Sequence, residues 1–86
     1  MSIHIVVLQR GWVVVGDIST HIGTIIKISG ASVIRRWGTT TGLGEIALGG
    51  PTDRTILDYA GVVRCHELGI VFMLDCVEEK WKLHIK

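Results

Sequence analysis

The chain has 86 residues and a mass of 9.4 kDa, which suits one domain, residues 1–86, and is too little for two. It is 48% hydrophobic with a mean hydropathy of +0.45. Charges and glycines nevertheless interrupt every apolar stretch before the roughly 18–20 residues that a membrane-spanning helix needs. Nine Lys and Arg against eight Asp and Glu leave a net charge of +1. We therefore expect neither duplex nucleic acid nor a membrane as partner, and no signal peptide.

The first part of the chain predicts short strands separated by glycine turns. Ile, Val and Thr make up 29 of the 86 residues, and these β-branched types favour strands. The expected strands are Ile3–Leu8, Trp12–Thr20, Thr24–Ser29 and Ser32–Trp37, with turns at Arg10-Gly11 and His21-Ile22-Gly23 and a bulge or break at Gly30. Because hairpin-length connections make neighbours antiparallel, these strands predict a meander.

Residues 41–49 change from a strand period to a helical one. The apolar residues at helical spacing are Leu43, Ile46 and Ala47. Thr40 or Thr41 can act as the N-cap, and Gly49-Gly50-Pro51 stops the helix. The pattern predicts one short helix, about two turns long.

The last part of the chain predicts a second set of strands. We expect a loop over Thr52–Tyr59, strands at Val62–His66, Ile70–Val77 and Trp81–Ile85, and turns at Glu67–Gly69 and Glu78–Lys80. The predicted fold is therefore mainly β: a small bent antiparallel sheet or partly open barrel, with the short helix filling one end.

The first strand is apolar on both faces. Ile3 and Ile5 point to one face and Val6 and Leu8 to the other. Such a strand needs either a tight barrel with a covered exterior or a second subunit, and we favour the second. A monomer would expose several of Val6, Leu8, Trp12, Val14, Ile70 and Phe72. We therefore expect a homo-oligomer with strand residues in its interface.

The segment from Val33 to Glu45 carries the most functional information. Its candidate ligand-binding residues are Arg35, Arg36, Trp37, Thr39, Thr40, Thr41 and Gly42. Arginine presents a planar fork to phosphate oxygens or a guanine edge, and tryptophan offers a plate on which a base stacks. Threonine hydroxyls and the N–H groups at a helix start suit a phosphate. Together they make the minimum of a nucleotide pocket.

The same residues also fit a structural interpretation. Gly42 to Ala47 matches G-x-G-x-x-A, but the chain is too short for the βαβ unit that gives this pattern its meaning. Arg35 and Arg36 alternate in direction on a strand, so at most one of them faces a given pocket. The glycines and threonines could form only a loop and a helix cap, and Trp37 could belong to the core.

The cysteines and histidines give only weak indications of a metal site or of a catalytic nucleophile. Cys65 and Cys76 are expected to be reduced, buried thiols. With His66 and one of His4, His21 or His84 they could offer zinc ligands, but the C-x-x-C knuckle is missing. Cys65 and His66 are adjacent on a strand and point to opposite faces, which disfavours a nucleophile pair. We expect no metal, no cofactor and no enzymatic activity.

Four further residues have expected structural roles. Asp17 fits an edge charge that opposes aggregation. Asp53 and Asp58 are expected to cap turns in a loop. Trp12 and Trp81 begin strands, where core or interface positions are expected.

The sequence from Gly11 to Gly50 resembles that of a widespread group of short phage-encoded proteins. The segments that carry the resemblance are Val33-Ile34-Arg35-Arg36-Trp37-Gly38, Leu43-Gly44-Glu45-Ile46-Ala47, Gly49-Gly50-Pro51, the later strand Ile70–Cys76 and the closing stretch at Trp81. The group that the chain resembles is taken to include the phage sponge proteins, which hold the cyclic nucleotide signals of bacterial immune systems such as CBASS without cleaving them. The resemblance implies an oligomeric binding protein in the host cell cytoplasm.

Two functional hypotheses follow. The first is a non-enzymatic counter-defence protein that sequesters a cyclic nucleotide, for example a cyclic dinucleotide such as cyclic GMP-AMP. The second is a phage structural or protein-inhibiting module with no small-molecule ligand, in which Arg35 and Arg36 are charges at the rim of an interface.

Overall fold

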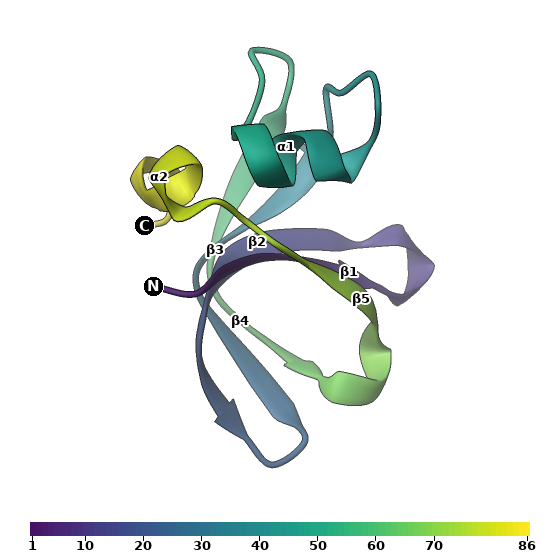
Figure 1. The fold of residues 1–86 in the computed structure, drawn as a ribbon. Coiled ribbons are helices and arrows are strands. Elements are labelled where there is room, and N and C mark those ends of the chain that lie inside the picture. Colours follow the sequence, from purple (N-terminus) through teal and green to yellow (C-terminus); the bar gives the residue numbers. More distant parts are fainter.

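The computed structural model describes residues 1–18 and 23–86 and is mainly β. Five strands form one antiparallel sheet in the order β4-β3-β2-β1-β5, and the sheet is not closed (Figure 1). The strands are β1 Ile3–Leu8, β2 Val13–Ile22, β3 Ile25–Arg36, β4 Ile56–His66 and β5 Ile70–Asp75. β1 to β4 form a meander, and β5 returns to pair with β1. The predicted fold class, a bent and open antiparallel sheet, is confirmed.

Two short α-helices lie together at one end of the molecule (Figure 1). They are α1, Leu43–Gly49, and α2, Glu78–Trp81, and three single 3-10 turns are η1 Gln9–Gly11, η2 Glu67–Gly69 and η3 Lys82–His84. The helix expected near 41–49 is present but begins at Leu43, with Gly42 at the N-cap. The expected threonine cap is wrong because Thr40 and Thr41 bond to a side chain further along, described below.

Two expectations in the second half of the chain are wrong. Thr52–Tyr59 is not all loop, since β4 begins at Ile56, where it pairs with Arg36 of β3. The strand expected over Trp81–Ile85 is a helical end instead. Trp81 is completely buried, and its indole N–H donates to the carbonyl of Ile46 at 2.7 Å, which fixes it under α1. Leu83, which a strand would place on the same face, is 87% exposed.

The glycine signals of the first half are mostly confirmed. Gly30 has φ of +59°, and the β3–β4 register shifts between Ile28 and Ala31, so the two expected strands are one bulged strand. The Arg10-Gly11 turn is also present, with φ of +66° and +81°. The predicted end of the second strand and the predicted turn at His21 and Ile22 lie outside the described residues.

Each face of the sheet has its own hydrophobic core. The helix-side core combines strand residues with both helices: Ile3, Ile5, Val13, Val15, Ile34, Leu43, Ile46, Ala47 and Trp81. The strand-only core consists of Val6, Val14, Ile26, Ile28 and Ala31, with partly buried Leu8, Ile18, Val33, Val63, Cys65 and Ile70 against it. Because all five strands contribute to the strand-only core, the sheet must curve around it.

This arrangement corrects our account of the two-sided first strand. Val6 and Val14 are at most 3% exposed within one chain, so they need no second subunit. Leu8 and Ile70 are half-buried, whereas Trp12 and Phe72 are exposed as expected. The role expected for Asp17 is also wrong. β2 lies inside the sheet, not at its edge, and a carboxylate oxygen of Asp17 accepts the N–H of Ser2 at 2.8 Å.

Candidate functional site

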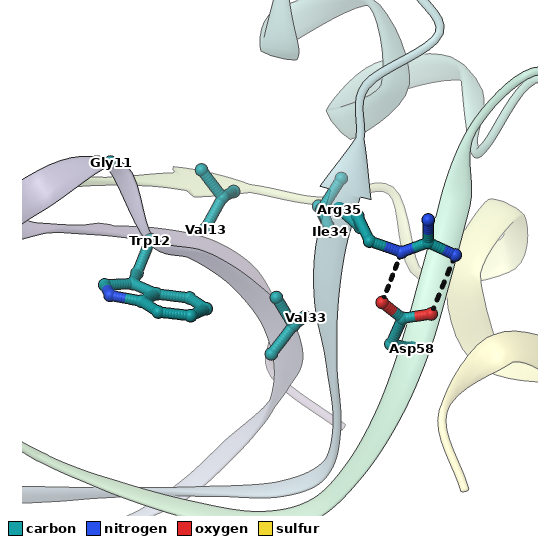
Figure 2. Close-up of a pocket in the computed structure, with 7 residues that line it drawn as sticks. All are labelled: Gly11, Trp12, Val13, Val33, Ile34, Arg35 and Asp58. Atoms are coloured by element: carbon teal, nitrogen blue, oxygen red, sulfur yellow. Dashed lines mark hydrogen bonds and ion pairs between the residues drawn. The ribbon is translucent and has the colours of Figure 1, made fainter.

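A cleft opens where β2 and β3 separate. Their ladder ends at the pair Val14 and Val33, while β2 stays paired to β1 as far as Val13 and β3 stays paired to β4 as far as Arg36. The space between the diverging strands has a volume of about 350 Å³. It is lined by Gly11, Trp12, Val13, Val33, Ile34, Arg35 and Asp58, and we call it the β2–β3 cleft (Figure 2).

Trp12 forms one wall of the β2–β3 cleft. The η1 turn and its left-handed residue Gly11 deliver the indole to the mouth of the cleft, immediately before β2 begins. Its side chain is 60% exposed, and Figure 2 shows its ring beside Val33. An exposed indole next to a small apolar floor can stack on a planar ring.

Arg35 and Asp58 form the opposite wall. Nε of Arg35 donates to Oδ2 of Asp58 at 2.7 Å, and Nη2 donates to Oδ1 at 3.5 Å. The hydrogen bond and the charge of Asp58 raise the pKa of Arg35. Both side chains are largely exposed, so this ion pair contributes little stability and a competing anion can replace it. Asp58 was expected to cap a turn in a loop, but it lies in β4.

The neighbouring residues of the predicted motif do not line the cleft. Arg36 is exposed and does not line the cleft. Trp37 is 43% exposed and therefore not a core residue. Its carbonyl accepts the hydroxyl of Thr55 at 2.7 Å, which ties the end of β3 to the turn before β4. Of the two arginines, only Arg35 reaches the cleft.

The threonine loop is occupied by a carboxylate of the chain itself. The backbone N–H and the hydroxyl of both Thr40 and Thr41 donate to Oε1 of Glu45, at 3.0 to 3.1 Å. These bonds, those from the two N–H groups first, lower the pKa of Glu45. The hydroxyl of Thr39 accepts the N–H of Gly42 at 3.2 Å. The predicted donors do gather around an anion, but that anion is internal.

The sequence interpretation therefore missed Trp12 and Asp58 as parts of the site. Trp12 was expected in the core or an interface because it begins a strand. The signal that could have found it is its position directly after the Arg10-Gly11 turn, which places Trp12 at the end of the sheet and not in its middle. Asp58 carried no signal, because its place beside Arg35 depends on the β3–β4 register.

The cysteines and histidines form no joint site in the described part of the chain. Cys65 and Cys76 are free and half-buried, and burial raises the pKa of both thiols, that of Cys76 to about 12. Nδ1 of His66 accepts the N–H of Leu68 at 3.1 Å and so caps η2. No three His, Cys, Asp or Glu side chains among the described residues come together as metal ligands. His21 lies outside this range.

Comparison of the chain with family models, curated proteins and solved structures gave no match. The resemblance to short phage proteins accordingly stays a prediction. In the part of the chain that the structure describes, no helix is long and apolar enough to cross a membrane.

Proposed function

We propose that this chain is a non-catalytic binding protein that holds a cyclic nucleotide in the β2–β3 cleft. One observation carries the proposal: an exposed indole, Trp12, and an exposed guanidinium, Arg35, line the same cleft of about 350 Å³. These are the two groups that a ligand with a planar base and a phosphate requires.

Each wall of the cleft has a distinct role in this proposal. Trp12 stacks on the base, which contributes about 1–3 kcal/mol. Arg35 exchanges the carboxylate of Asp58 for a phosphate oxygen, an exchange that costs little because the pair is exposed. The released carboxylate of Asp58 can then accept N–H groups from a base edge. Val33 supplies the apolar floor.

The biological role that we propose is sequestration inside an infected host cell. A sponge must bind a micromolar signal tightly, with a dissociation constant near 1 nM, or about −12 kcal/mol. Trp12 and Arg35 are both exposed, so a cyclic dinucleotide held between them would keep part of its surface exposed to solvent. Enclosure between two copies of the chain would remove that exposure and supply the missing affinity.

Calorimetry against a panel of cyclic mono-, di- and trinucleotides tests this proposal. Trp12→Ala and Arg35→Ala should each weaken binding by about 5- to 150-fold, the range that corresponds to the loss of one stacking or charged contact. Trp37→Ala and Arg36→Ala are the matched controls and should leave the affinity unchanged. Absence of heat with every ligand would end the proposal. Loss of binding only in the two control variants would move the site to the end of β3.

A second candidate function is a protein-interaction module. Val71, Phe72 and Met73 of β5 are consecutive, and each is between 43% and 60% exposed. Purification of the protein from infected cells distinguishes the two functions. A small ultraviolet-absorbing molecule released on denaturation supports nucleotide binding, whereas a stoichiometric protein partner supports the second function. Conversion of an added nucleotide to a new product, seen by mass spectrometry, would contradict both.

A further inference from the structure

The sheet has two edge strands, and they differ in how far they are protected against pairing. β4 carries the charged residues Asp58 and Arg64 within its length, and Gly61 holds a φ of +81° in the middle of the strand. Charges and a local kink are the features by which natural edges avoid pairing with other chains. β4 is therefore a protected edge.

β5 lacks such charges and glycines, and its one irregularity is the register shift against β1 beyond Phe72. Between Ile70 and Leu74 it contains no charge, glycine or proline. Its charged residue, Asp75, is the last of the strand, where Oδ1 lies 3.0 Å from Nε2 of His4. Val71, Phe72 and Met73 expose apolar side chains on both faces of the strand. An unprotected apolar edge of this kind favours addition of another strand.

The backbone of β5 is also oriented for pairing. Its register against β1 runs without a shift up to Phe72, and at the other end the N–H of Cys76 donates to the carbonyl of Ile3 at 3.0 Å. Hydrogen-bonded positions alternate along an antiparallel ladder, so the backbone groups of Leu74 and Phe72 also point to β1. The N–H and C=O of Met73 therefore point outward, away from the sheet.

We propose that β5 pairs antiparallel with β5 of a second copy of this chain, with Phe72 opposite Phe72 of the partner subunit. A twofold axis normal to the sheet requires a register centred on one residue, and Phe72 is the centre that uses all three exposed side chains. Val71 then lies opposite Met73 of the partner subunit, twice by symmetry. The two five-stranded sheets become one continuous sheet.

Self-complementarity is the reason to choose a second copy as the occupant. In this register every exposed apolar residue of β5 meets another, and the central pair of phenylalanines is an aromatic cross-strand contact. Phe72 occupies a non-hydrogen-bonded position on this edge, where opposite side chains come closest. No like charges face each other within the paired residues, because Asp75 lies beyond them. This surface is separate from the β2–β3 cleft and does not depend on its ligand.

Sedimentation velocity at micromolar concentration tests the interface and its register. The wild-type chain should sediment as a species whose mass is twice the 9.4 kDa of one copy. Val71→Lys combined with Met73→Lys places like charges opposite each other and should raise the dimer dissociation constant by about tenfold or more. Val71→Lys combined with Met73→Glu places opposite charges in the same two pairs and should restore the dimer. Val62→Lys on the protected edge is the matched control and should change nothing.

Other results would overturn the inference. They are a wild-type species of 9.4 kDa, a dimer that persists with both lysines, or equal loss of the dimer in the two double variants. Cross-linking offers a second measurement that leaves the edge uncharged. Phe72→Cys should form an intermolecular disulfide under mild oxidation, because the two positions face each other across the axis. Val62→Cys should not. Equal cross-linking of both variants would also contradict the proposed register.

Discussion

The helix-covered end of the molecule and the β2–β3 cleft use the same residue types in opposite ways. Under the helices Trp81 is fully buried and its N–H is bonded to Ile46, whereas Trp12 at the cleft is 60% exposed. In the first turn of α1 the Glu45 carboxylate accepts four hydrogen bonds, whereas the carboxylate of Asp58 holds an exposed arginine. Satisfied groups stabilise the fold, and exposed ones are available to a ligand.

Replacement of Trp81 should give the largest effect on stability. Trp81→Ala removes a buried indole from the helix-side core together with its hydrogen bond to the carbonyl of Ile46, which keeps the N–H of Gly50, so we expect a loss of about 3–5 kcal/mol in the free energy of unfolding. Urea unfolding followed by circular dichroism measures it. Trp12→Ala is the control at the cleft and should stay within about 0.5 kcal/mol of the wild type. Equal losses in the two variants would erase the distinction between the two regions.

Two glycines of the loop before α1 give the next effect. Gly38 and Gly42 have φ of +67° and +99°, so alanine is strained by about 1–3 kcal/mol at either position. A Cβ at Gly38 would in addition lie 2.6 Å from the N of Thr55 and collide with the backbone of Arg54, whereas at Gly42 it meets no described atom within 4 Å. Gly38→Ala should therefore lower the unfolding midpoint in urea more than Gly42→Ala. The reverse order would show that the loop is not packed against the turn at 52–55.

Glu45 should give the smallest and the most pH-dependent effect. Its pKa in the folded chain lies below the ordinary value of 4.5, because the ionised form receives the bonds from Thr40 and Thr41. Its stabilising effect is therefore complete above that ordinary value and is lost as the pH falls through the lowered pKa. Glu45→Gln should lower Tm at neutral pH, and the difference from the wild type should shrink on acidification. A difference that grows on acidification would contradict this assignment.

Much of the fold could be predicted from local patterns. The first strand, Ile3–Leu8, has the predicted bounds, and the bulge at Gly30 is where glycine interrupts a β-branched run. The C-terminal segment could not be predicted in this way. Trp81, Leu83 and Ile85 alternate as a strand would, but the pattern does not contain the carbonyl of Ile46, which binds the indole and selects a helical turn.

The candidate site depended even more on long-range contacts. Arg35 was predicted, but its neighbours in the cleft are not its neighbours in sequence. Trp12 and Asp58 reach it only because the β2–β3 ladder ends where the β3–β4 ladder continues. Thr40 and Thr41 were predicted to donate to a ligand phosphate, and in the structure they donate to the carboxylate of Glu45. What sequence alone did not indicate is that Glu45 folds back and satisfies them before any ligand arrives.

The pairing of the first strand with the last has a consequence during protein synthesis. His4 pairs with Asp75, so β1 is synthesised long before its partner strand β5 and stays without it until nearly the whole chain is made. At about 5–20 residues per second this interval lasts roughly 4–14 s. Until β5 emerges, one backbone edge of β1 has no strand beside it, and β1 is an almost wholly apolar segment. A nascent chain stalled before residue 70 would therefore be a substrate for chaperones, and release of the final strand would end that exposure.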